Sequence, residues 1–175
     1  ASPKPHSPLH SLPVGNIFDR IAMDILELPL TTNGNKYAIV CTEYLSKWVI
    51  AQSISDIKAE TVAQFLLTQV ILQHGAPKSF LTDQGKQFTS QIITELCRLM
   101  DIKKLNTVPY HPQTDGLVER FNRTLIQMLA TCVQDHADSW DNLLPYVTFA
   151  YNTSVQDSTT KSPFEVIYGR HPQYP

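Results

Sequence analysis

The sequence predicts one α/β domain built on a mixed five-stranded sheet flanked by helices. Three strand-like segments come first and are followed by alternating helical and strand-like segments, which is the order of an α/β domain. The length of 175 residues and the 42% hydrophobic content suit a single domain with a substantial core. There is no internal repeat and no low-complexity tract.

The first three strands are predicted from β-branched and aromatic residues over residues 17–28, 37–42 and 48–53. Between the first two, Asn33-Gly34 is a strong turn signal, so we expect antiparallel pairing in a meander.

The rest of the chain alternates helix and strand. Residues 59–74 carry apolar side chains at helical spacing and end at Gly75, which predicts a helix. The remaining predicted elements are a strand at 79–82, a helix at 90–100, a strand at 102–105, a polar loop at 107–116, a long helix at 117–135, and helices at 140–151 and 163–168. This order matches a ribonuclease H-like layout.

Composition excludes some classes of protein. No apolar run approaches the roughly 20 residues that span a bilayer, so we expect no membrane function. The cysteines Cys41, Cys97 and Cys132 are far apart and form no CxxC pair, which favours reduced thiols in packing roles over metal ligands. The net charge of −2 is unusual for a free-standing nucleic-acid-binding domain.

The amino-terminal segment differs from the rest of the chain. Pro3, Pro5, Pro8 and Pro13 lie among small and polar residues, as in a linker. We therefore divide the chain into a linker at residues 1–15 and one domain at residues 16–175, and expect it to be a piece of a larger protein whose other parts supply phosphate contacts.

Two aspartates stand out against apolar surroundings. Asp24 interrupts a strand-like segment apolar enough to be central in a sheet, where an uncompensated carboxylate is costly. Asp83 follows the short strand at 79–82, at the carboxyl end where open α/β sheets gather ligands. The two side chains are expected to converge, although Asp24 also fits an edge-strand charge and Asp83 a turn or cap residue.

The long helix supplies a third carboxylate. Its apolar stripe passes through Phe121 and Leu125, and Glu119 points away from that stripe on the same side as Asn122 and Arg123. Glu119 is therefore a candidate ligand with phosphate-binding neighbours, or else only a surface partner of Arg123. Carboxylates alone suit Mg²⁺ or Mn²⁺ rather than zinc, and two such ions activate the attacking oxygen and stabilise the departing oxygen in phosphoryl transfer.

The surrounding residues carry a resemblance over nearly the whole chain. The matching segments are Met23-Asp24-Ile25, Ser46-Lys47-Trp48, His74-Gly75-Ala76-Pro77, Thr82-Asp83-Gln84-Gly85, Tyr110-His111-Pro112-Gln113-Thr114-Asp115-Gly116, Glu119-Arg120-Phe121-Asn122-Arg123, Tyr151-Asn152, Ser162-Pro163-Phe164 and Tyr168-Gly169-Arg170. Together they resemble the catalytic core of retroviral-type integrases, in the Ty3/gypsy retrotransposon branch.

The resemblance implies a ribonuclease H-like fold and a catalytic, metal-binding triad of Asp24, Asp83 and Glu119. It implies an endonuclease and DNA strand transferase that processes 3′ ends and joins them to target DNA, with Mg²⁺ or Mn²⁺ as cofactor. The implied partners are DNA, further copies in a dimer or higher multimer, and a chromatin or host tethering protein. The implied location is the nucleus, or a virus-like particle for an active element.

Further DNA contacts are expected from Asn122, Arg123 and the loop before the long helix, through Tyr110, Gln113 and Gly116. That loop either borders a DNA strand or merely caps the helix, whose amino terminus favours phosphate. His111 is not expected to bind metal.

Two other functions remain open. One is a host protein derived from an integrase and kept as a DNA-binding or dimerisation module with idle catalysis. The other is a ribonuclease H-type hydrolase, which the matching segments outside the triad disfavour. Lys86 and Glu43 depart from the pattern without disturbing the triad.

Overall fold

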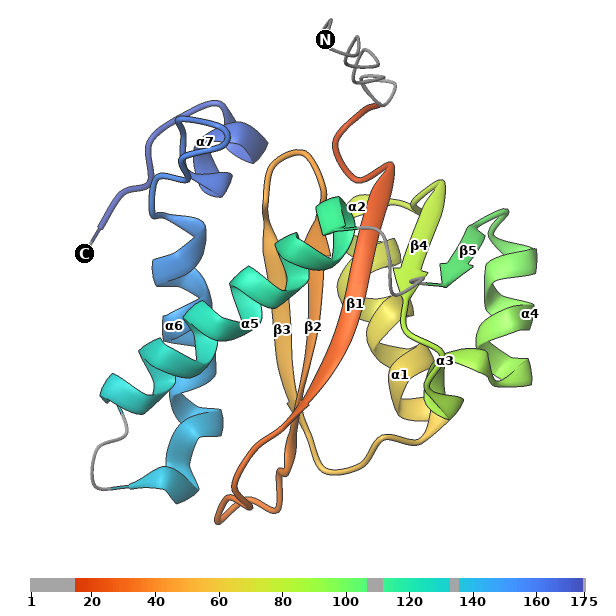
Figure 1. Cartoon of the computed structure of the whole chain (residues 1–175), viewed down its shortest axis with the longest axis horizontal. Coiled ribbons are helices and arrows are strands. Elements are labelled where there is room, and N and C mark those ends of the chain that lie inside the picture. Colours follow the sequence, from red (N-terminus) through yellow and green to blue (C-terminus); the bar gives the residue numbers. More distant parts are fainter. Residues whose placement is uncertain (1–14, 107–111, 133–135, 175) are drawn as a thin grey trace, which may run out of the picture.

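A computed structural model describes residues 15–106, 112–132 and 136–174, and the side chains of residues 112–118 and 132 fall outside that description. The sheet has the order β3-β2-β1-β4-β5 (Figure 1). Its strands are β1 (Arg20–Glu27), β2 (Tyr37–Glu43), β3 (Val49–Ile54), β4 (Ser79–Thr82) and β5 (Lys103–Asn106). The first three strands are antiparallel, whereas β4 and β5 run parallel to β1, so the predicted mixed five-stranded sheet is confirmed.

The helical elements agree with most predictions. They are α1 (Ala59–Phe65), η1 (Leu66–Ile71), α2 (Leu72–His74), α3 (Lys86–Thr89), α4 (Gln91–Leu99), α5 (Pro112–Cys132), η2 (Ala137–Ser139), α6 (Trp140–Asn152) and α7 (Pro163–Tyr168). The predicted helix at 59–74 is present as α1, a π-helical segment and α2 in succession.

Two elements begin at other residues than predicted, and one short helix was not predicted. The first strand begins at Arg20 rather than at residue 17, because Phe18 adopts a left-handed conformation (φ 66°) that an extended strand excludes. The single-turn helix α3 occupies a stretch for which no element was predicted. The long helix begins at Pro112 rather than Leu117, since proline is pre-organised for the first helical position.

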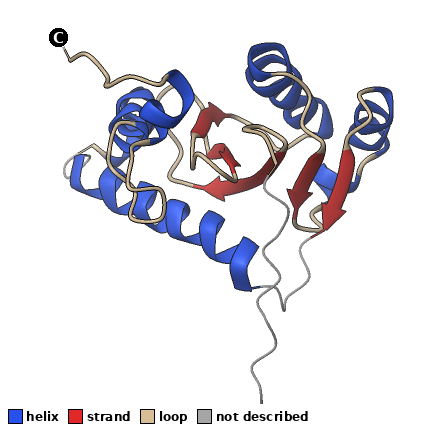
Figure 2. Ribbon diagram, turned by 90° about the horizontal axis from the view of Figure 1, so that it is seen from above, coloured by secondary structure: helices blue, strands red, loops and turns tan. Residues whose placement is uncertain are grey.

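Two hydrophobic cores lie on opposite faces of the sheet, because successive strand residues point to opposite sides. Ile21, Met23 and Phe80 pack with α1, α3 and α4 on one face. Val40 packs with Phe121 of α5 and Leu144 of α6 on the other. Figure 2 shows α5 running along one face of the sheet. The described helices on that face do not cover β4 and β5.

One buried carboxylate fixes the connection between β1 and β2. Asp141 of α6 accepts hydrogen bonds from Thr31, Asn33 and Asn35, so it ties the β1–β2 connection to the helix layer. The Asn33-Gly34 turn is present, with Gly34 at φ 83°, but within a nine-residue connection from 28 to 36 rather than a two-residue hairpin.

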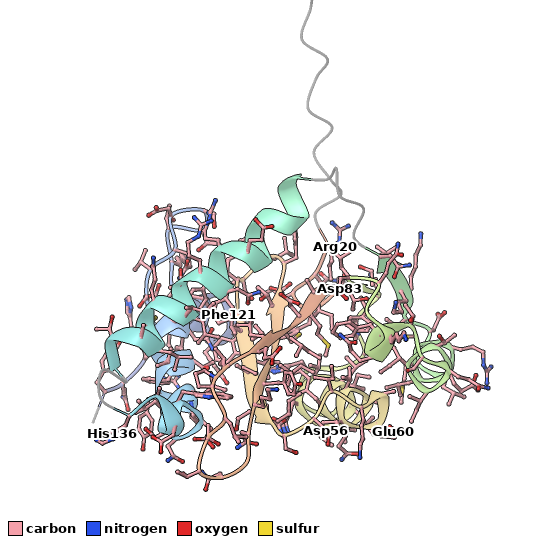
Figure 3. All side chains as sticks on the ribbon, turned by 60° about the horizontal axis from the view of Figure 1, so that its bottom comes forward. Arg20, Asp56, Glu60, Asp83, Phe121 and His136 are labelled. Atoms are coloured by element: carbon pink, nitrogen blue, oxygen red, sulfur yellow. The ribbon has the colours of Figure 1, made fainter. Side chains whose placement is uncertain are left out.

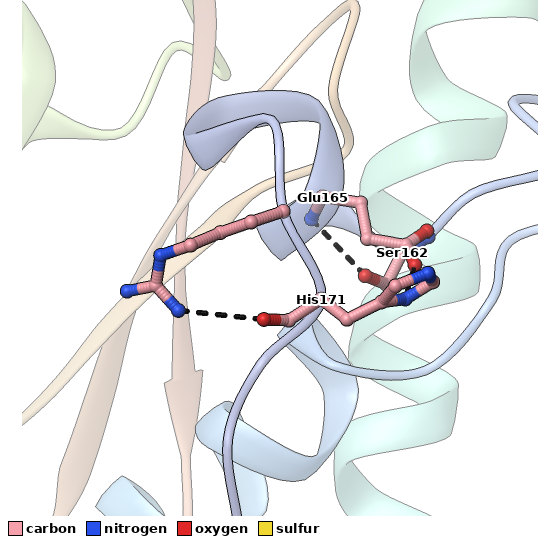
Figure 4. A network of polar contacts seen from close by, with 4 residues as sticks. Ser162, Glu165 and His171 are labelled. Atoms are coloured by element: carbon pink, nitrogen blue, oxygen red, sulfur yellow. Dashed lines mark hydrogen bonds and ion pairs between the residues drawn. The ribbon is translucent and has the colours of Figure 1, made fainter.

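The last helix is defined by its caps. The Ser162 hydroxyl accepts from the Glu165 backbone N–H, and the Glu165 carboxylate accepts from the Ser162 backbone N–H, which forms a capping box (Figure 4). His171 also contacts the Glu165 carboxylate, so the segment after α7 folds back onto it. In the part of the chain that the structure describes, no helix has the length and apolar character needed to span a membrane.

Candidate active site

Strand register places Asp24 and Asp83 next to each other. In the parallel pair of β1 and β4, Arg20 lies opposite Ser79 and Ala22 lies opposite Leu81. Continuing this register by two residues sets Asp24 opposite Asp83, with both side chains on the face of Ala22 and Leu81. The two aspartates therefore lie on the same face of the sheet and at neighbouring positions, as their predicted convergence requires.

Asp24 lies in a partly buried, hydrogen-bonded position on the face that α5 covers. Its Oδ1 accepts from the Ile25 backbone N–H at 2.9 Å, and its Oδ2 accepts from the Asn122 amide at 2.6 Å. Burial raises the pKa of Asp24, the two hydrogen bonds oppose that rise, and the nearby charge of Asp83 adds to it. The carboxylate is thus held in place at an electrostatic cost.

Asp83 is exposed and is oriented by the turn that follows it. Its Oδ1 accepts from the Gly85 backbone N–H at 2.8 Å. A Cβ at Gly85 would lie 2.9 Å from that same oxygen and 2.6 Å from the Gln87 amide nitrogen. A larger residue at position 85 would therefore displace the Asp83 carboxylate or the Gln87 amide, a role of Gly85 that the Asp83-Gln84-Gly85 pattern did not by itself reveal.

Glu119 lies on the solvent side of α5, as its position off the apolar stripe predicts. Glu119 and Arg123 are exposed, whereas Phe121 and Leu125 are buried. No ion pair joins Glu119 to Arg123, although both belong to the described residues, so the simple surface pair is not formed. Among described residues no group of three or more acidic, His or Cys side chains lies close enough to hold one metal ion, so Asp24, Asp83 and Glu119 do not yet form a three-ligand site.

Asn122 has a partner that sequence reasoning missed. It was expected to contact DNA, but its side chain is only 9% exposed and its amide donates to Asp24. Its Oδ1 is buried and has no hydrogen-bond partner. The available signal was its place beside the apolar stripe of α5, which turns it toward the sheet. The structure makes Asn122 a positioning residue for Asp24.

The other expected DNA contacts are less well defined. Gly116 lies inside α5, more than a turn beyond Pro112, so the prediction that it lies in a loop just before the helix is wrong. Gln113 is also in the first turns of α5, but its side chain is outside the described residues, as is the whole of Tyr110.

The donor set fits a hard divalent cation. Carboxylate oxygens are the ligands that Mg²⁺ and Mn²⁺ prefer, and the Asp24 and Asp83 carboxylates are close enough for the charge of one to affect the other. Burial and the charge of Asp83 both raise the pKa of Asp24, and a cation between the two carboxylates would relieve that repulsion.

Comparison with known proteins identifies the class of this domain. A family model described as integrase core domain matches residues 18–112, and the mixed sheet with its flanking helices is ribonuclease H-like. The chain belongs to the integrase core domain family.

Its curated relatives are of the Ty3/gypsy retrotransposon type. The chain is 35% identical over 159 residues to the Retrovirus-related Pol polyprotein from transposon 412 of Drosophila melanogaster, covering 90% of the chain and 13% of the polyprotein. It is 28% identical to Gypsy retrotransposon integrase-like protein 1 of Bos taurus, covering 95% of the chain and 33% of that protein. The chain therefore spans well under half of these relatives, and the family recognised from the motifs is confirmed.

Solved structures agree with this assignment. The crystal structure of the catalytic core domain of BIV integrase superposes with a TM-score of 0.70 at 28% identity, covering 85% of this chain and 93% of that one. An integrase chain in the simian T-cell lymphotropic virus intasome, in complex with PP2A regulatory subunit B56 gamma, gives 0.74 at 25% identity, covering 97% and 62%.

Proposed function

We propose that this domain is a metal-dependent polynucleotidyl transferase that processes the 3′ ends of element DNA and joins them to target DNA. The observation that carries the proposal is the strand register that sets Asp24 beside Asp83, with Asn122 holding the Asp24 carboxylate. Integrase family membership supplies the reaction class, and the carboxylate pair supplies chemistry suited to it.

The chain's own groups have distinct roles in this proposal. Asp24 and Asp83 bind Mg²⁺ or Mn²⁺, which would polarise the scissile phosphate and activate the attacking oxygen. The attacking oxygen belongs to water in end processing and to the freed 3′ hydroxyl in joining. Glu119 completes the ligand set when DNA is bound, because its exposed position on α5 leaves it free to turn toward the metals.

Arg123 is the proposed DNA contact on α5. It is exposed, and it lies one helical turn from Glu119 on the same side of the helix. Arg123→Ala should lower the salt dependence of DNA binding by about one phosphate contact. An unchanged salt slope would remove Arg123 from the DNA surface, and Lys161→Ala, at an exposed position after α6, is the charge-matched control.

The whole protein needs more than this chain. With a net charge of −2, the chain should bind DNA weakly at physiological salt, and other parts of a longer protein would supply the missing phosphate contacts. We propose action as a dimer or higher multimer on DNA, in the nucleus or a virus-like particle, with a host protein as tether. The intasome among the structural relatives, which carries a host phosphatase subunit, supports this picture.

The decisive experiment compares two reactions. Because the metal ligands all lie within this chain, it should resolve a preformed branched DNA with Mn²⁺, the reverse of joining, far better than it inserts two ends together. Asp24→Asn and Asp83→Asn should each abolish resolution without unfolding the domain. Full activity in either variant would remove the assignment of these residues.

A second function, a domesticated module with idle catalysis, remains distinguishable from this one. The similarity, at 28% identity, to Gypsy retrotransposon integrase-like protein 1 of Bos taurus gives it a specific basis. Metal binding at the aspartates without activity on branched DNA, DNA ends or RNA:DNA hybrids would favour it. Cleavage confined to RNA:DNA hybrids would instead favour a ribonuclease H-type hydrolase.

A further inference from the structure

Two cations lie over the ring of Tyr44 at the amino-terminal end of β1, and a third lies near one of them. The guanidinium of Arg20 lies 5.1 Å and the ammonium of Lys47 lies 4.8 Å from the centre of the Tyr44 ring. Arg120, on α5, is close enough that its charge, after burial, contributes to lowering the pKa of Lys47. We call Arg20, Lys47 and Arg120 the Tyr44 cluster.

The positive charge of the cluster is not balanced by neighbouring acids. Among described side chains, no hydrogen bond or ion pair joins any of the three cations to a carboxylate. The carboxylate whose charge reaches Lys47 is Glu43, but Glu43 is buried and its oxygens accept from Phe18, Leu45 and Ser46. Although the whole chain has a net charge of −2, these three cations therefore give this region an excess of positive charge, which a bound anion would neutralise.

The backbone at Lys47 is held in an unusual conformation. Lys47 has φ 65°, the left-handed region where glycine or asparagine is ordinarily found. Its ammonium donates to the Tyr44 carbonyl at 2.6 Å, so the side chain is fixed over the ring instead of extending freely into water. A costly backbone position occupied by an ordered cation indicates that the charge itself is used.

Covalent connection ties the cluster to the proposed active site. Arg20 lies four residues before Asp24 in β1 and on the same face, a separation of about 13 Å at 3.3 Å per residue. Arg120 directly follows Glu119 in α5. Figure 3 shows Arg20 at the same end of the molecule as Asp83, which directly follows β4, the strand paired in parallel with β1.

We propose that the Tyr44 cluster binds the phosphates of the DNA strand whose reacting phosphate lies at Asp24 and Asp83, within a few nucleotides of that phosphate. This inference rests on the proposed function and adds to it the path of the strand over β1. The cluster is a positioning element, because it lies too far from the reacting atoms to touch them.

Neutral phosphates give the sharpest test. Binding of a branched oligonucleotide is measured by fluorescence anisotropy in EDTA at 50 mM salt, with a single methylphosphonate placed in turn two to six nucleotides from the reacting phosphate. The wild-type chain should lose about three- to tenfold in affinity when the phosphate that contacts the cluster is the neutral one, and less at the other positions. Lys47→Gly and Arg120→Gln should each lower the affinity for unmodified DNA by a similar factor. On DNA that is neutral at the contacted phosphate, the same substitutions should lower the affinity little further.

The controls separate charge from folding. Lys47→Gly suits the left-handed backbone, so its melting temperature should not fall, and Lys58→Gln removes an exposed charge at the start of α1, which packs on the opposite face of the sheet. The cluster does not bind the strand if, at every methylphosphonate position, the free-energy losses of the substitution and of the methylphosphonate add without coupling. The same conclusion follows if Lys58→Gln weakens DNA binding as much as Lys47→Gly does. Because no metal is present, this result is independent of whether the chain is active.

Discussion

Replacing Asn122 with alanine tests how the Asp24 carboxylate is held. The lost contact is a 2.6 Å hydrogen bond from a buried amide to a carboxylate, of the kind that contributes about 1.5–3 kcal/mol. At 1.4 kcal/mol for each factor of ten, the expected loss of Mn²⁺ affinity is about ten- to hundredfold, the range seen when groups that orient metal ligands are removed. Because the Asn122 hydrogen bond lowers the pKa of Asp24, its removal also lets protons compete better with the metal.

Two measurements check this expectation. Calorimetric titration with Mn²⁺ should show the weaker affinity, and the acid limb of the pH profile for branched-DNA resolution should move to higher pH. The matched control is Gln127→Ala, at an exposed position farther along α5, which should change neither quantity. If Asn122→Ala leaves both the affinity and the pH profile unchanged, the hydrogen bond does not position Asp24, and the role of Asn122 must be sought in DNA binding.

Three further predictions concern the site and its support. Folding raises the pKa of Asp24, so the wild type becomes more stable as the pH falls toward the pKa of Asp24 in the unfolded chain. Asp24→Asn should therefore be more stable than wild type in urea at pH 7 without metal, and this difference in stability should shrink near pH 4. Gly85→Ala should weaken Mn²⁺ binding in titrations because its Cβ crowds the Asp83 carboxylate, whereas exposed Gln84→Ala should not; equal affinities would refute the crowding. Phe121→Ala should cost about 3–5 kcal/mol in chemical denaturation, against less than about 0.5 kcal/mol for Ile126→Ala, which is 46% exposed; similar losses would contradict the assigned core.

The parts of the site that lie on regular elements were predictable from local patterns. The apolar strand around Asp24 and the strand ending at Asp83 fix both residues to one sheet, and alternation of strand residues then gives their shared face. The exposed position of Glu119 follows in the same way from the helical period of Phe121 and Leu125.

The contacts that join distant segments could not be predicted in this way. The Asn122–Asp24 hydrogen bond spans 98 residues, and no local pattern encodes the angle at which α5 crosses β1. The early start of α5 was missed because polar residues with prolines were taken as loop, although Pro112 suits a first helical turn. The left-handed Phe18 was missed because its conformation depends on a hydrogen bond to Glu43, 25 residues away.

The division of the hydrophobic residues into two cores affects how the site comes apart. Asp24 and Asp83 are linked through the hydrogen bonds of the sheet, whereas Asn122 and Glu119 are carried by α5, which is held through the second core. Local opening of the α5–α6 layer would leave the paired aspartates in place and remove the other two residues together. Hydrogen exchange should therefore release α5 as a unit before β1, and mutations that loosen Leu125 or Leu129 should inactivate the domain at temperatures where its sheet is still intact.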